Sequence, residues 1–400
     1  MNDFSNIKFK TIIFLTIFFE SLLFAQELSP KVKFLKGNFE DKQIAVKQAA
    51  LIGDYKLAYD SLNFCLSSKQ ILENDSDLEN LVLESLNALS KTDVLNANFS
   101  EKDENLNFTS VFSAVFNNFD SDEIRTKILI LFKENPSVAN IALVNNYVSE
   151  NMQTAKEMNS VLLEAIKGLE FYGNSTSFRL LFIADILEVW QDYDEILENS
   201  YGTLSIYSEN EILHILSSVP VEKKILILQK LNKNPKISQK IRGEVAENAL
   251  SQSINYIGEN LNTESEFLQE DLQLQKLALD TISLTKWTRA SELANKYFEI
   301  AKNQYELKNI SAEVFSQIIK DISSVATSKT DKILSEYLDF LNKSTEQNQA
   351  VDMNVVLSVI NALGDLGDKA AFDYLLYVTY LDYPEEVTTA ARNALSKLKW

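Results

Sequence analysis

Glycine and proline are scarce in this chain, which contains 9 Gly and 5 Pro among its 400 residues. Average proteins contain about 7% glycine and about 5% proline. Folds built from strands and tight turns need these residues at the turns. Their scarcity therefore favours helices joined by short polar connections. Hydrophobic residues make up 46% of the chain, which is enough for a sizeable core and argues against general disorder.

Histidine and cysteine each occur once. His214 lies between Leu213 and Ile215 in a helical stretch, so we expect a packed, hydrogen-bonded side chain rather than a base or a metal ligand. Cys65 lies in another apolar helical stretch and has no second cysteine to pair with, so we expect it to be a small buried hydrophobe. One His and one Cys cannot assemble a zinc site of nitrogen and sulfur ligands.

Positive charge is also in deficit, and the formal net charge is −19. Binding to nucleic acid or to an anionic membrane surface needs a concentrated basic surface, so we expect neither. The basic residues between Lys223 and Arg242 form a local patch, which we interpret as a solvated face. We interpret the overall acidity as a contribution to solubility; the alternative is an acidic docking surface for a basic partner.

Sequence motifs of catalysis are missing: there is no Gly-rich phosphate loop, no nucleophile elbow and no EF-hand loop. Carboxylates are abundant, for example at Glu264, Glu266, Glu270 and Asp271. Paired carboxylates can hydrolyse glycosidic bonds, but only in a defined cleft with a specific spacing. Our interpretation of these four is surface solvation. We therefore predict no enzymatic activity, no cofactor, and no catalytic, cofactor-binding or metal-binding residue.

The N-terminus has the order of a secretory signal. Two lysines precede an apolar run over residues 11–19, which resumes before Ala25. The run is shorter than the about 20 residues that a membrane-spanning helix needs. We predict a signal peptide over residues 1–25, cleavage after Ala25, a polar linker over residues 26–40, and a periplasmic location. The alternative is an uncleaved signal that anchors the protein to the inner membrane.

The C-terminal region contains one helical pattern twice. Val355, Val359, Ala362 and Leu363 recur as Val387, Ala391, Ala394 and Leu395, at a constant offset of 32 residues. A fixed offset of this size is typical of stacked helical hairpins, each too small to bury its own apolar face. We expect these positions to face inward.

Further residues near both ends follow a known family pattern. Val46-Lys47 precedes Ala49-Ala50 and Gly53-Asp54, and Ala362-Leu363 precedes Gly364-Asp365. In this the chain resembles HEAT-repeat proteins of the short-repeat kind. Val387 is followed by Thr388 where the family prefers a basic residue, and residues 95–350 share only the helical periodicity. The resemblance implies an α-solenoid that presents a surface to partners, and it implies no chemistry.

Several local expectations follow from the helical spacing of apolar residues. Pro220 and Pro235 separate helices over 209–218 and 221–232, and a strongly apolar helix reaches from Phe178 to Val189. Gly53 supplies a left-handed residue at a helix end. We also expect a polar loop near 91–107, and Trp400 as the cap of the last apolar layer.

We therefore predict an all-α protein, an α-solenoid of stacked antiparallel helical hairpins over residues 41–400. Its expected role is that of an exported, non-enzymatic scaffold or binding module in the cell envelope. The partner would be a protein or peptide, with no nucleic acid and no membrane insertion of the mature chain. Two alternatives are a helical polysaccharide hydrolase or lyase that uses paired carboxylates, and a purely structural spacer.

Overall fold

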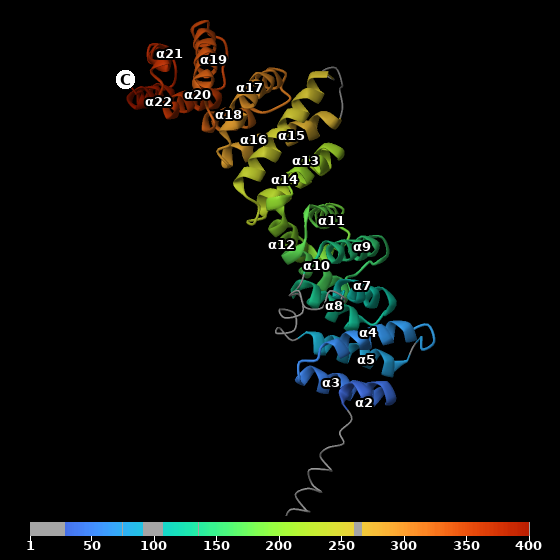
Figure 1. Ribbon diagram of the computed structural model, residues 1–400. Helices are drawn as coiled ribbons and strands as arrows, with labels where there is room; N and C mark the ends of the chain where they lie inside the picture. The colour runs from blue at the N-terminus through green and yellow to red at the C-terminus, as the bar shows by residue number, and fades with distance from the viewer. Residues whose placement is uncertain (1–28, 74, 91–106, 135, 260–265, 400) are drawn as a thin grey trace, which may run out of the picture. The chain divides into compact units, whose positions relative to one another are not determined.

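The computed structural model describes residues 29–73, 75–90, 107–134, 136–259 and 266–399 (Figure 1). These residues form α-helices and short 3₁₀ segments with no β-strand, which confirms the prediction of an all-α protein. None of the described helices is long and apolar enough to cross a membrane. The expected signal peptide, nearly all of the expected polar loop near 91–107, and Trp400 lie outside the described residues.

The chain forms two compact units, and the first extends to Gly173. Each helix of the first unit packs on its neighbour in the chain and often on the helix after that; for example, α3 contacts α4 and α5, and α8 contacts α10. The described helices of this unit are α2 (Pro30–Lys36), α3 (Phe39–Leu51), α4 (Lys56–Ser68), α5 (Ser76–Leu89), α7 (Phe108–Asn118), α8 (Asp122–Glu134), α9 (Val138–Thr154) and α10 (Ser160–Tyr172).

Helix α2 occupies part of the segment expected to be a polar linker over 26–40, so the linker prediction is wrong there. The helix begins at Pro30, whose fixed φ suits the first turn. Phe34 is buried and meets the ring of Phe64 in α4 edge-on, with the ring centroids 5.9 Å apart. Phe34 is the buried residue of this helix, and one buried position gives no periodic signal in the sequence.

The second unit begins at Asn174 and contains the remaining helices. They follow one another in chain order in Figure 1. Their bounds are α11 (Ser175–Ile186), α12 (Asp194–Leu204), α13 (Glu209–Ser218), α14 (Val221–Lys233), α15 (Gln239–Glu259), α16 (Glu266–Leu284), α17 (Ser291–Glu306), α18 (Ala312–Ser324), α19 (Ser328–Glu346), α20 (Met353–Leu366), α21 (Phe372–Val378) and α22 (Glu385–Lys397). The helices expected over 209–218 and 221–232 are thus confirmed as α13 and α14.

Helices of the second unit contact each other in two rows. Along one row, α14, α16, α18, α20 and α22 each pack on the next; along the other, α13, α15, α17, α19 and α21 do so. Helices adjacent in the chain, such as α15 with α16 and α17 with α18, join the rows. The core lies between them: Phe298 of α17 stacks on Phe315 of α18, with centroids 5.7 Å apart, and Tyr337 of α19 meets both rings edge-on.

The repeated C-terminal pattern lies on α20 and α22, which are neighbours in the first of these rows. The repeated positions face inward as expected: seven of the eight are buried and Leu395 is half-buried. The helices approach closely at Gly364, where an added Cβ would lie 2.8 Å from the Cβ of Ala394. Glycine is required at this position by space rather than by backbone conformation.

Helix ends use the left-handed conformation despite the shortage of glycine. Gly53 adopts it after α3 with φ of 80°, as expected, and Gly367 adopts it after α20. Elsewhere non-glycine residues do so, namely Glu188, Lys286, Lys308 and Asn348. The turn at Glu188 ends α11 at Ile186, before Val189, so the apolar helix expected to reach Val189 is shorter than predicted.

Candidate ligand-binding cavity

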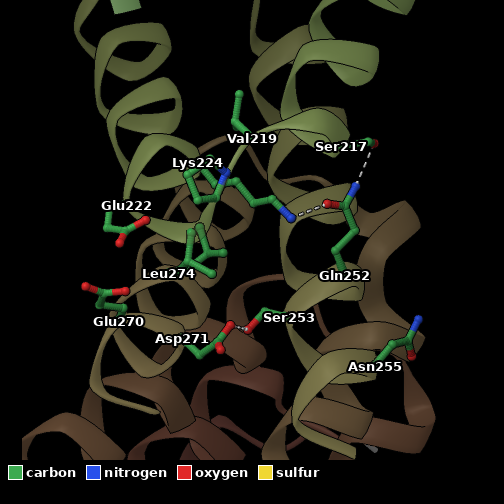
Figure 2. Close-up of a pocket in the computed structure, with 12 residues that line it drawn as sticks. Ser217, Val219, Glu222, Lys224, Gln252, Ser253, Asn255, Glu270, Asp271 and Leu274 are labelled. Carbon is green, nitrogen blue, oxygen red and sulfur yellow. Dashed lines mark hydrogen bonds between the residues drawn. The ribbon is translucent and has the colours of Figure 1, made fainter. Parts of the chain in front are cut away.

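A cavity of about 690 Å³ opens in the second unit between the α13–α14 connection, α15 and α16 (Figure 2). We call it the α14–α16 cavity. Its lining combines apolar side chains with charged and amide groups: Ser217, Val219, Pro220, Val221, Glu222, Lys224, Gln252, Ser253, Asn255, Glu270, Asp271 and Leu274. Its volume falls within the range of about 300–1,000 Å³ that is usual for small-molecule sites.

The local sequence explains how these groups meet. Pro220 is the N-cap of α14 and cannot extend α13, so the chain turns at Val219–Pro220 and leaves both at the edge of the cavity. Helix α15 is 21 residues long and carries Gln252 and Ser253 past this turn. Helix α16 packs along α15, and its first turns bring carboxylates to the opposite wall.

A series of side-chain hydrogen bonds crosses the cavity wall from Lys224. Its Nζ donates to Oε1 of Gln252 at 2.8 Å, and Nε2 of Gln252 donates to Oγ of Ser217 at 3.0 Å (Figure 2). These bonds fix the orientation of the Gln252 amide and hold the ammonium group at the cavity. Burial lowers the pKa of Lys224, and the carboxylate of Asp271 opposes that shift.

A second series of side-chain hydrogen bonds contains Asp271, which is only 2% exposed. The Ser253 hydroxyl donates to Oδ1 of Asp271 at 2.7 Å, and Nε2 of Gln275 donates to the Ser253 oxygen at 3.0 Å. Burial raises the pKa of Asp271, while the bond from Ser253 and the charge of Lys224 oppose the rise. The expectation that this carboxylate is solvated at the surface is therefore wrong.

The position of Asp271 could have been found from the sequence. Leu274, Ala278 and Ile282 form the buried stripe of α16, and one turn further back this stripe reaches residue 271. Burying a carboxylate on the apolar side of a helix costs free energy unless it is hydrogen-bonded. Such a residue therefore indicates that polar groups surround it in the folded protein. Of the other carboxylates singled out, Glu270 also lines the cavity, while the side chains of Glu264 and Glu266 lie outside the described residues.

Carboxylates form close pairs elsewhere in the unit. Asp280 of α16 has Asp321 of α18 as a neighbour, and Glu209 has Glu244 of α15, each pair close enough to shift the pKa of a carboxyl in it. Burial and the neighbouring Asp321 raise the pKa of Asp280 to about 6. Both pairs join neighbouring helices, and we interpret them as contacts that position those helices.

A buried ion pair between two helices of the second unit has a third charged residue beside it, on another helix. Lys230 of α14 donates to Oδ1 of Asp185 of α11 at 2.8 Å and lies 3.8 Å from Glu198 of α12. Asp185 is fully buried, and burial raises its pKa against the opposing charge of Lys230. Burial would lower the pKa of Lys230, but the Asp185 carboxylate makes the net shift upward. Lys230 thus departs from the solvated face expected between Lys223 and Arg242.

The single histidine and cysteine behave differently from one another. Cys65 is fully buried, as expected, and burial raises the pKa of its thiol to about 12. His214 is exposed, so the expectation of a packed side chain is wrong. Ile212, Ile215 and Leu216 form the buried stripe of α13, and residue 214 falls outside it. Among the residues that the structure describes, no group of His, Cys, Asp and Glu could hold a metal ion.

Comparison with protein-family models, with curated proteins and with solved structures finds no match to this chain.

Proposed function

We propose that this protein is an exported, non-enzymatic α-solenoid of HEAT-like helical hairpins that acts as a scaffold or binding module for a protein or peptide in the cell envelope. The observation that carries the proposal is the two-row packing of α13 to α22. Each helix contacts its hairpin mate and the equivalent helix of the next hairpin. Stacked repeats contact only their neighbours in this way.

The two rows also suggest which surface binds. Along the row from α14 to α22, α20 and α22 approach so closely at Gly364 that an added Cβ would lie 2.8 Å from the Cβ of Ala394. In a curved stack the helices on the inner side lie closer together, so we assign the α14–α22 row to the concave side. Solenoids bind their partners on such extended concave surfaces.

A polar groove of about 450 Å³ lies on this row, over α18, α20 and α22. Gln317, Asn361 and Lys397 are among its lining residues and offer amide and ammonium groups. Lys397 bonds Asp365 at 2.8 Å, which orders one edge of the groove. Such a surface suits an extended peptide, whose backbone needs donors and acceptors at regular intervals.

Site-specific photo-crosslinking tests the proposal. A photoreactive phenylalanine analogue replaces the exposed Asn361 in the groove, and the control carries it at Lys332 of α19, on the other row. In intact cells we expect discrete protein adducts from position 361 and few from position 332. Equal labelling from both positions, or none from either, would contradict the proposed binding face.

The export part of the proposal has its own test. The intact mass of the protein from the producing cells should correspond to a chain that begins at Gln26, in the periplasmic fraction. A mass that includes residues 1–25, found in the membrane fraction, would favour the uncleaved anchor instead.

A further inference from the structure

We propose that the α14–α16 cavity binds a small zwitterion with an apolar side chain, an amino acid or a short peptide, whose carboxylate pairs with Lys224 and whose ammonium group pairs with Asp271. This inference is separate from the proposed protein-binding role, because the cavity and the groove over α18, α20 and α22 share no lining residue.

The first argument is that opposite charges line the cavity without neutralising one another. No ion pair joins Lys224 and Asp271 among the contacts of the described residues, although each senses the charge of the other. An ammonium group has three donors, and one of those of Lys224 goes to Gln252. One oxygen of Asp271 accepts from Ser253. A ligand with a carboxylate and an ammonium group would satisfy what remains on both.

The second argument is the energetic state of the two groups. Asp271 is 2% exposed, and burial raises its pKa. Burial also lowers the pKa of Lys224. Each charged form is therefore under-stabilised by the protein groups around it. A bound counter-charge would offset this loss of solvation. Its attraction to Lys224 or Asp271 would be stronger in the cavity than at the surface.

The third argument concerns the rest of the lining. Val219, Pro220 and the buried Leu274 provide an apolar surface for a side chain. Asn255 and Gln252 provide amides that could bond a peptide group. Figure 2 shows Lys224 and Asp271 entering from different helices with Leu274 labelled between them in the view.

The charge of the cavity edge selects against acids. Glu222, which is exposed, and Glu270 add negative charge to the lining. They disfavour dicarboxylates and simple carboxylic acids, which would otherwise bind to Lys224. The ligand class is therefore a zwitterion with an apolar body rather than an anion.

Isothermal titration calorimetry with the full mature chain tests this inference. The probes are leucine, dileucine and trileucine, each also as its C-terminal amide (which lacks the carboxylate) and as its N-acetyl form (which lacks the ammonium group). We expect binding by at least one of the three zwitterions, and weakening of at least about tenfold on loss of either charge from it. The preferred length distinguishes a free amino acid from a peptide. The inference would be overturned if no zwitterion bound at about 1 mM. It would also be overturned if a zwitterion bound no more tightly than its amide and its N-acetyl form.

Two variants assign the charges to residues. In Lys224→Met, loss of the ligand carboxylate should no longer weaken binding; in Asp271→Asn, loss of the ligand ammonium group should no longer do so. The matched control is Lys329→Met, at an exposed ion pair with Glu292 on α17 and α19, which should bind like the unaltered chain. If either variant fails to fold, the analogue series on the unaltered chain still decides the question. Loss of crosslinking at position 361 would not affect these outcomes, so the two proposals fail separately.

Discussion

At the scale of single residues, buried charges are the most demanding feature of the second unit. Asp185 and Lys230 connect α11 with α14, and Asp271 is held by Ser253 and Gln275. Such groups are costly to bury unless they are fully partnered. Their positions therefore fix which helix faces meet, and a change at one of them affects more than its own side chain.

Removing one partner of the buried pair should be severe. In Lys230→Met the Asp185 carboxylate stays buried without a counter-charge, so we expect a loss of about 3–5 kcal/mol in the free energy of unfolding at pH 7. Urea unfolding followed by circular dichroism measures it. The control Lys233→Met removes a lysine that is 78% exposed and 3.9 Å from Glu198, and its effect should stay within about 0.5 kcal/mol. Equal losses would show that the buried pair contributes nothing specific.

Burial of single residues was predictable from the sequence where helical period alone decides it. The predicted burial of the stripes on α20 and α22 and of Cys65 is confirmed. The prediction for His214 is wrong because the angular position of a residue on α13, and not its sequence neighbours, decides its burial. The prediction for Asp271 is wrong because an acidic composition favours solvation for any carboxylate. The cavity could not be predicted, since it depends on how three elements meet in space.

At the scale of elements, α20 and α22 pack closely because a glycine leaves no side chain between them. Gly364 of α20 meets Ala394 of α22 without space for a Cβ. Glycine in a helix interior costs about 0.5–1 kcal/mol relative to alanine, so its presence here is explained by packing. Elements are the level that the sequence predicts best, and α2 escapes prediction because Phe34 alone among its side chains is buried.

Gly364→Ala tests the close approach. The gain in helix propensity should be outweighed by the clash with the Ala394 backbone and side chain, with a net loss of about 1–3 kcal/mol in unfolding free energy. Thermal unfolding measures this loss. Ser358→Ala in the same helix is the control, because Ser358 bonds only its own helix carbonyl, and it should change stability by about 0.5 kcal/mol or less. A stabilised Gly364→Ala variant would refute the packing argument.

The raised pKa of Asp280 predicts a pH dependence of stability. The folded-state pKa of Asp280 is raised to about 6, above the about 3.9 of an unfolded aspartate. The folded state therefore binds the extra proton, and its contribution is complete below about pH 4 and is lost as the pH rises through about 6.

Asp280→Asn should remove this dependence. The amide mimics the protonated carboxyl and can donate to Asp321, so stability at pH 7 should rise by about 1–2 kcal/mol after allowance for solvent screening. Stability measured between pH 4 and pH 7 should become flatter than for the unaltered chain. The exposed Glu292→Gln is the matched control and should leave the profile unchanged. An unchanged profile in Asp280→Asn would contradict the raised pKa of Asp280 as the source of the dependence.

At the scale of the whole molecule, neighbour-only contacts predict local responses. If the second unit is a stack of hairpins, its stability is a sum of repeat and interface contributions, so a change in one repeat should affect mainly its neighbours. Amide hydrogen exchange measures this helix by helix. Gly364→Ala should speed exchange in α20 to α22 and leave α3 to α5 unchanged. A uniform change across all helices would indicate one cooperative fold instead of a stack.

The contact between Gly364 and Ala394 also has a consequence for sequence divergence. Neither position can accept a larger side chain while the other stays as it is, because the two share one small space. Substitutions at 364 and 394 in descendants of this gene should therefore be correlated, and each would restrain drift in the other. This coupling would slow substitution in α20 and α22. It offers a reason why the repeated sequence pattern is best preserved where these two helices are in contact.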